Sequence, residues 1–176
     1  MAGVVRAGSW ERRERTDVLR FTLELARPVH QVWPVVATPA GLRGWLADAD
    51  PLEARLGGAV TLRWLNAGDG GRATVAEGTV TAWDLEHVAE YTVAGHGRIR
   101  FHLAPAGATD GTVLRFTNEV ACADEPDRLS RLAGWHQHLE HLAEALEGRP
   151  RDRSASTPDR YRELYAAYEA PGGRQS

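Results

Sequence analysis

Two Trp-containing segments with the apolar spacing of helices stand far apart in the chain and enclose a middle with the pattern of strands. The first lies within residues 28–46 and the second within 126–148. Between them, short runs alternate between apolar and polar residues, and turn-forming sequences such as 68–71 separate the runs. Successive strands without intervening helices predict an antiparallel meander. This order predicts an α+β domain in which a sheet wraps against a long C-terminal helix, an arrangement that tends to enclose a pocket.

Six segments have the period-two alternation of strands with one apolar face. In one of them Ile99, Phe101 and Leu103 alternate with Arg98, Arg100 and His102. The six segments are 18–25, 59–65, 74–83, 88–93, 98–103 and 113–120.

Proline, threonine and glycine positions mark the ends of the expected helices. Pro28 suits the first position of a helix, whereas Pro34 removes a backbone donor and should shorten or distort that helix. Thr38 is a good N-cap and Pro39 fits a first turn, so a second short helix should follow. The long final helix should start near 126 and end at Gly148. Its apolar stripe comprises Leu129, Leu132, Trp135, Leu139, Leu142 and Leu146.

The ends of the chain differ in composition from its centre. The charged residues 1–16 predict a flexible N-terminal tail, with docking of Trp10 on the domain as the alternative. A single domain over 17–149 follows. A polar linker over 150–157, a short helix over 158–170 and a tail over 171–176 should follow. One side of the short helix carries Tyr161, Leu164, Tyr165 and Tyr168.

Charge and cysteine content exclude several kinds of partner and site. The net charge is -3, so no general positive field favours nucleic acid or an acidic membrane surface. No apolar stretch is long enough to span a bilayer, and a cytoplasmic protein is expected. Cys122 stands alone, which excludes an internal disulfide and a Cys cluster for zinc. The absence of Lys beside abundant Arg, Ala and Gly indicates a GC-rich, bacterial genome.

Four short motifs occur in one order with compatible spacing. They are Val32-Trp33 with Thr38-Pro39, Leu42 and Trp45; Gly78-x-Val80; Gly111-Thr112-x-Leu114; and Gly134-Trp135-x-x-x-Leu139-x-x-Leu142. On these motifs, the chain resembles the SRPBCC (START-related, helix-grip) superfamily over about residues 17–148. Within it, the subfamily named after the activator of the heat-shock-protein-90 ATPase is the most similar. The chain departs from that subfamily where Asp84-Leu85 replaces a proline pair, and at Pro34.

The resemblance implies a fold and a pocket. It implies a helix-grip fold with a seven-stranded antiparallel sheet wrapped on the long C-terminal helix, and two short helices after the first strand. It also implies a cavity between the sheet and that helix. Members of the superfamily include ligand carriers, cyclases, hydrolase-like enzymes and cochaperones, so the fold does not fix a reaction.

Seven residues are candidates for ligand binding in such a cavity. Core packing is the competing interpretation, and it is preferred for Trp135 and left open for Trp64. Asn118 shares the face of Leu114 and Phe116, so its amide either binds a ligand or caps the end of the sheet. The candidates are Trp64, Glu90, Phe101, Leu103, Phe116, Asn118 and Trp135.

The direction of Glu90 is ambiguous. The subfamily match favours Val88 facing inward, which would carry Glu90 into the cavity and raise its pKa by desolvation. The apolar alternation instead favours Tyr91 facing inward, which would place Glu90 on the outer face.

The remaining chemical groups predict no metal, cofactor or catalytic set. His138 and His141 have a spacing that two metal ligands can share, but with His136 they flank the apolar stripe, so a solvent-facing cluster is expected. No Ser-His-Asp, Cys-His, phosphate-loop or dinucleotide motif occurs in the required context.

Three functions follow from these observations. The first is binding of a small apolar or aromatic molecule between sheet and helix. The second is a protein-interaction module, with a protein partner or a second copy of the chain, that uses the Tyr-rich helix and an outer sheet face with Arg63, Arg98, Arg100 and Arg115. The third, placed below both, is an enzyme of cyclase or hydrolase type with Glu90 or a His as general acid or base. Binding is therefore expected more than catalysis.

Overall fold

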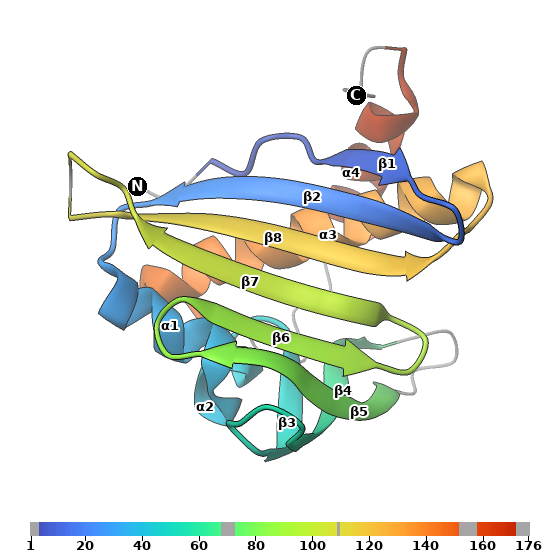
Figure 1. Cartoon of the computed structure of the whole chain (residues 1–176). Helices are drawn as coiled ribbons and strands as arrows, with labels where there is room; N and C mark the ends of the chain where they lie inside the picture. The colour runs from blue at the N-terminus through green and yellow to red at the C-terminus, as the bar shows by residue number, and fades with distance from the viewer. Residues whose placement is uncertain (1–3, 68–72, 109, 152–157, 172–176) are drawn as a thin grey trace.

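The computed structural model describes residues 4–67, 73–108, 110–151 and 158–171. Within this part of the chain, eight strands form one antiparallel sheet, accompanied by four helices (Figure 1). In chain order the elements are β1 (Ser9–Arg12), β2 (Thr16–Leu25), α1 (Val29–Ala37), α2 (Pro39–Arg43), β3 (Ala47–Leu52), β4 (Ala59–Ala67), β5 (Ala73–Asp84), β6 (Val88–Val93), β7 (Gly97–Pro105), β8 (Thr112–Ala121), α3 (Glu125–Leu146) and α4 (Pro158–Glu169).

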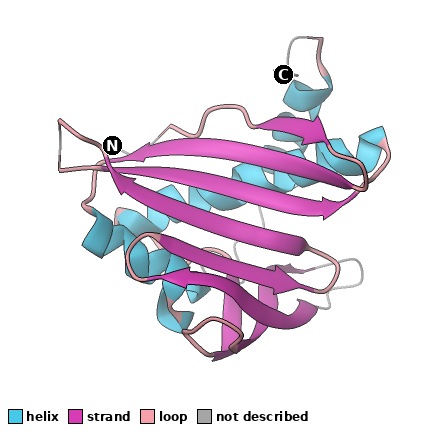
Figure 2. Ribbon diagram, viewed as in Figure 1, coloured by secondary structure: helices cyan, strands magenta, loops and turns pink. Residues whose placement is uncertain are grey.

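The sheet is a meander whose last strand returns to the first. The strand order is β1-β2-β8-β7-β6-β5-β4-β3, and neighbouring strands are antiparallel. The long helix α3 crosses behind the sheet in the view of Figure 1, and α1 and α2 lie beside one end of it (Figure 2). The predicted α+β fold with an antiparallel sheet and a long helix is therefore confirmed.

The core fills the space between the centre of the sheet and α3. Phe116 on β8 lies 5.4 Å from Phe101 on β7 and 4.5 Å from Trp135 on α3, measured between ring centroids. Trp45 packs edge-on against Phe101 at 5.9 Å, and Trp33 packs against Trp83 at 5.2 Å. Trp83 is partly buried and the other large side chains of this set are buried, so they hold the helices to the sheet rather than line an open space.

The sheet has eight strands, and the expectation of seven is wrong. The additional strand is β1, which pairs with β2 although residues 1–16 were expected to be a flexible tail. Long-range contacts order this segment. The Gly8 amide donates to Tyr168 Oη at 2.7 Å, and the Arg128 guanidinium lies 3.8 Å from the ring centre of Trp10.

The strand β3 was not visible in the alternation of the sequence. It contains Asp48, Asp50 and Pro51, which are unusual in a central strand. It lies at the edge of the sheet, next to β4, with a shift of register between Ala49 and Leu52. An edge position tolerates charged residues and proline, so the alternation of apolar and polar residues that marks the other strands is absent there.

The helix signals were largely correct. Thr38 Oγ1 accepts a hydrogen bond from the Gly41 amide at 3.0 Å, so the expected restart at Thr38-Pro39 is confirmed. The long helix ends before Gly148, which has φ +79°. The helix α4 packs on α3 and buries Leu164 and Tyr168. None of the helices in the described ranges has the length and apolar character needed to cross a membrane.

Candidate functional site

A cavity of about 280 Å³ lies at one end of the space between α3 and the sheet. Its walls come from β4 and β5, the turn between β6 and β7, α3 and α4. This volume is near the lower end for small-molecule sites, which suits a ligand of one or two rings. The described residues that line it are Trp64, Thr74, His96, Ser130, Arg131, Gly134, Trp135, His138 and Tyr161.

Four aromatic rings form the apolar wall of the cavity. The ring of Trp64 lies 4.4 Å from that of His96 with an angle of 30° between their planes. It meets Trp135 edge-on at 5.7 Å, and His138 lies 5.7 Å from both indoles. Rings from three separate segments of the chain thus converge on one site and form an aromatic wall.

Two nitrogen atoms in this wall are buried without a hydrogen-bond partner among the described residues. They are Nε1 of Trp64 and Nδ1 of His138. An unpaired buried polar group costs about 1–3 kcal/mol. By contrast, Trp135 Nε1 donates to Asn118 Oδ1 at 3.0 Å, and the hydroxyls of Ser130 and Tyr161 are 2.7 Å apart. The hydrogen-bonding capacity of the wall is therefore incompletely used.

The histidines of this region are neutral at pH 7. Burial, followed by the nearby His141, lowers the pKa of His138 to about 3. Burial also lowers the pKa of His141 to about 4, with Arg151 the next cause, and burial lowers the pKa of His96. A hydrogen bond to the Trp45 backbone opposes the shift at His138. Since Nδ1 is the unpaired atom, that bond comes from Nε2–H, and Nδ1 carries a lone pair.

Arg131 is the one formally charged residue among the described lining residues. Its Nη1 donates to the Ala121 carbonyl at 3.3 Å, and its positive charge is among the causes that lower the pKa of His96. The guanidinium thus lies near His96, and the described lining residues together carry a positive formal charge.

Gly134 sits in the interior of α3 and faces the cavity. A β-carbon at this position would meet no described atom beyond its own stretch of helix within 4 Å. Glycine costs about 0.5–1 kcal/mol relative to alanine in a helix interior. No close contact requires glycine at this position, so packing does not account for the loss of helix stability. The missing side chain leaves the cavity open.

The predicted site residues are divided between the cavity and the core. Trp64 and Trp135 line the cavity. Phe101, Leu103 and Phe116 face α3 but lie within the filled core, and none of them lines the cavity. Asn118 lies behind the wall. Its Nδ2 donates to the carbonyls of His96 at 2.8 Å and Arg98 at 3.1 Å, while its Oδ1 accepts from Trp135.

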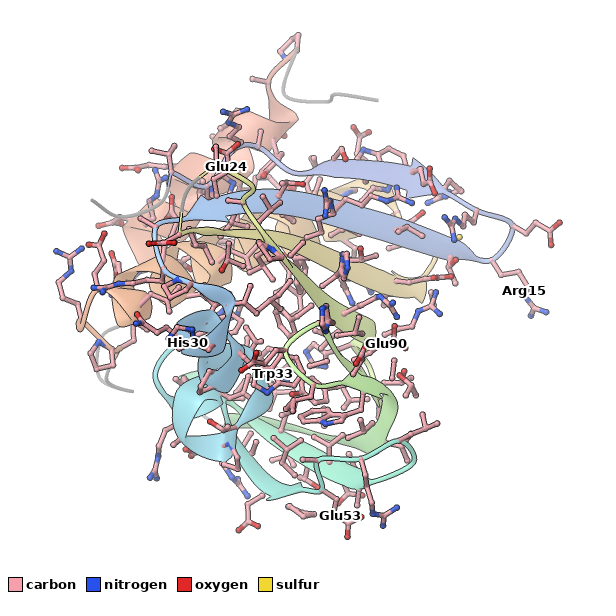
Figure 3. The ribbon with its side chains drawn as sticks, turned by 60° about the vertical axis from the view of Figure 1, so that its left-hand side comes forward. Arg15, Glu24, His30, Trp33, Glu53 and Glu90 are labelled. Carbon is pink, nitrogen blue, oxygen red and sulfur yellow. The ribbon has the colours of Figure 1, made fainter. Side chains whose placement is uncertain are left out.

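The direction of Glu90, which the sequence left open, follows the apolar alternation and not the subfamily match. Its place among the ligand-binding candidates is therefore corrected, because Glu90 does not line the cavity. Tyr91 faces the core and pairs with Ile99, so Glu90 lies on the other face of β6, where it pairs with Arg100. Glu90 is among the side chains labelled in Figure 3. Glu90 accepts hydrogen bonds from Arg100 Nη1 at 2.8 Å and from Thr81 Oγ1 at 2.7 Å. These neighbours bury the carboxylate, which explains why a charged residue is only 4% exposed outside the cavity.

The expectation of a solvent-facing histidine cluster is also wrong for two of its members. His138 is packed between Trp64 and Trp135, and His136 is buried with Nδ1 2.8 Å from Tyr168 Oη. The spacing of His138, three residues after Trp135, was the available signal. Within the ranges that the structure describes, no three His, Cys, Asp or Glu side chains gather in a metal-binding arrangement.

A second hollow of about 840 Å³ lies along α2 and β3. Its charged residues include Arg43 and Asp48, which pair with each other at 2.9 Å. Because this hollow lacks an aromatic wall and its lining includes no atom left buried and unpaired, the smaller cavity is the candidate site.

Solved structures share the fold at low sequence identity. CalU16 from Micromonospora echinospora is 16% identical with a TM-score of 0.66, covering 96% of this chain and 97% of that one. The protein encoded by gene BPP1335 from Bordetella parapertussis is 21% identical with a TM-score of 0.65, covering 94% of each chain. EF2215 from Enterococcus faecalis, described as a conserved protein of unknown function, is 14% identical with a TM-score of 0.65, covering 92% of this chain and 90% of that one.

The family comparison agrees with the motifs in the sequence. No curated protein matches the chain. The family described as Activator of Hsp90 ATPase homolog 1-like protein matches residues 26–147, which include both Trp-containing segments and every strand between them. This match confirms the resemblance to the SRPBCC-type fold, and the chain belongs to the family of Activator of Hsp90 ATPase homolog 1-like proteins.

Proposed function

We propose that this protein binds a small, largely apolar or aromatic molecule in the cavity between α3 and the sheet. The observation that carries the proposal is an aromatic-walled cavity of about 280 Å³ in which two buried ring nitrogens have no hydrogen-bond partner among the described residues. A ligand that fills this volume would bury the aromatic surface, and small rearrangements of Trp64 or His138 would let it use their hydrogen-bonding capacity.

Gly134 gives independent support. A helix-interior glycine with no steric need is unfavourable for stability, but it preserves the volume that a ligand requires. The family's helix-grip architecture also places a ligand space between sheet and helix, although here the centre of that space is filled by Phe101, Phe116 and Trp135. The site of binding that we propose is therefore the end of the space near Trp64.

The protein-interaction alternative has less support. Its Tyr-rich helix packs on α3 of the same chain, with Leu164 and Tyr168 buried. On the outer sheet face, Arg98 pairs with Glu119 and Arg100 pairs with Glu90. Since these groups already have partners within the chain, neither feature calls for another protein.

An enzymatic role for Glu90 in the cavity is not proposed, because Glu90 lies on the other face of the sheet. Binding without catalysis, a cytoplasmic location and a bacterial source stay predictions from the sequence.

Gly134→Leu tests the proposal without the loss of stability that substitutions in a protein core usually cause. The leucine would project into the cavity, while loss of the glycine favours the helix. Isothermal titration of the purified protein with 2-naphthoate and 2-naphthamide should show saturable binding of at least one compound. Gly134→Leu should weaken that binding at least about tenfold, since the leucine occupies the ligand's space.

Ala167→Leu is the matched control, because it adds the same side chain at an exposed helical position outside the cavity lining. It should leave the affinity unchanged. Absence of binding by both compounds, or equal binding by Gly134→Leu and the wild type, would refute the proposed function.

A further inference from the structure

We infer that the cavity selects a planar aromatic carboxylate, with the carboxylate held at the Arg131 end. This inference rests on the proposed function and adds to it the charge and the orientation of the ligand.

The first support is the charge of the wall. Arg131 contributes a positive charge, and the described lining residues include no Asp or Glu. A neutral ligand would leave that guanidinium uncompensated inside a partly desolvated site, whereas an anion would neutralise it. Charge complementarity of this kind is a common source of ligand selectivity.

The second support is the hydrogen-bonding capacity of Arg131. A guanidinium has five N–H donors in a planar fork that matches the two oxygens of a carboxylate. Among the described residues this guanidinium has one hydrogen bond, from Nη1 to the Ala121 carbonyl at 3.3 Å. The Nε1–H of Trp64 is a further donor without an acceptor. Arg131 can therefore donate to an oxyanion directly, and the buried Trp64 Nε1–H can do so after a small rearrangement of the indole.

The third support is the position of the groups along α3. Arg131 and His138 are seven residues apart, which is two helical turns and about 10 Å along the axis. The unpaired lone pair of His138 Nδ1 would repel a carboxylate, so the anionic group belongs at the other end of the cavity. Trp135 and Gly134 lie between the two ends, where they face the rings of the ligand. Two fused rings with one carboxylate fit this length.

Matched ligands test the inference. 2-Naphthoate, 2-naphthamide and 2-naphthylmethylamine share one ring system and differ in charge. We expect 2-naphthoate to bind at least about tenfold more tightly than the amide, as charge-assisted hydrogen bonds imply. The amine should bind most weakly. Arg131→Gln should remove the preference for 2-naphthoate and leave the affinity for 2-naphthamide within about twofold, because the substitution removes the charge.

Arg115→Gln is the control, because it removes one positive charge from an exposed position on the other face of the sheet. It should preserve the order of the three ligands. Equal or tighter binding of the amide by the wild type, or an unchanged preference in Arg131→Gln, would overturn the inference while leaving the proposed function intact. If none of the three compounds binds, both the inference and the proposed function fail.

Discussion

Trp135 Nε1 donates a hydrogen bond to Asn118 Oδ1 at 3.0 Å, which joins α3 to β8 behind the wall of the cavity. The same amide uses its Nδ2 to hold the carbonyls of His96 and Arg98 at the start of β7. One buried side chain thus fixes the indole and the turn that form opposite parts of the wall.

Replacing Asn118 by Leu should destabilise the protein by about 2–4 kcal/mol, because the indole N–H and two carbonyls lose their partner in a buried setting. Urea denaturation measures the change in the free energy of unfolding. Thr117→Ala, at the half-buried neighbouring position on the outer face, should cost much less. Similar effects of the two substitutions would contradict the role assigned to Asn118.

Replacing Gly134 by Ala should stabilise the protein by about 0.5–1 kcal/mol, since alanine is the better helix former and its methyl group meets no neighbouring element. Thermal unfolding of the ligand-free protein measures this gain as an increase in Tm. A decrease in Tm would show that the position is more crowded than the structure indicates.

Stability should fall as the pH falls from about 6.5 towards 4. The pKa of His138 is lowered to about 3 and that of His141 to about 4, so the unfolded chain binds protons in this range that the folded chain does not. One such histidine changes the free energy of unfolding by about 1.4 kcal/mol per pH unit. Urea denaturation at pH 7.0, 6.0 and 5.0 measures the slope.

Protonation of Glu140 affects the free energy of unfolding only at a lower pH. Burial opposes its ionisation, but hydrogen bonds from His136 and Arg160 hold its pKa at about 2. The contribution of Glu140 to the free energy of unfolding is therefore lost only as the pH falls below about 4.5.

His138→Phe should therefore reduce the slope of the free energy of unfolding against pH between pH 7 and 5, whereas the exposed substitution His30→Gln should preserve it. The same slope in His138→Phe and the wild type would be incompatible with a buried neutral His138.

Replacing Tyr168 by Phe should loosen the N-terminal strand. The buried hydroxyl accepts from the Gly8 amide at 2.7 Å and lies 2.8 Å from His136 Nδ1, so its loss leaves two buried groups unpaired and costs about 1–3 kcal/mol. Hydrogen exchange should accelerate at Gly8 and within Ser9–Arg12. Tyr165→Phe, at a half-buried position on the same helix, should leave exchange there unchanged. Equal protection of β1 in both variants would show that other contacts order this strand.

The sequence predicted the elements whose stability is local. Alternation identified β7 and β8 because their outer faces are polar and their inner faces apolar, and capping residues identified α2. It did not reveal β1, which pairs with the neighbouring β2 but whose charged residues lack the alternation of a strand. Further contacts to β1 and the residue before it come from Arg128 and Tyr168, more than a hundred residues away. It also missed β3, whose charged residues are tolerated at an edge.

The candidate site was less predictable because it depends on which side chains meet across the fold. Trp64 and Trp135 were among the predicted site residues, and both line the cavity. The pairing that buries Glu90 with Arg100 on the outer face required the strand register. His138 is covered by Trp135 from its own helix and by Trp64, which β4 brings against it. No pattern within α3 alone encodes that contact.

The indole N–H resonances of the six tryptophans offer the most direct test of binding in this cavity. During a titration of the ¹⁵N-labelled protein with 2-naphthoate, the Nε1–H signals of Trp64 and Trp135 should shift together and saturate. The signals of Trp10 and Trp83, which lie outside the cavity lining, should stay in place. Unshifted Trp64 and Trp135 signals, or shifts confined to Trp10 and Trp83, would contradict the proposed ligand site.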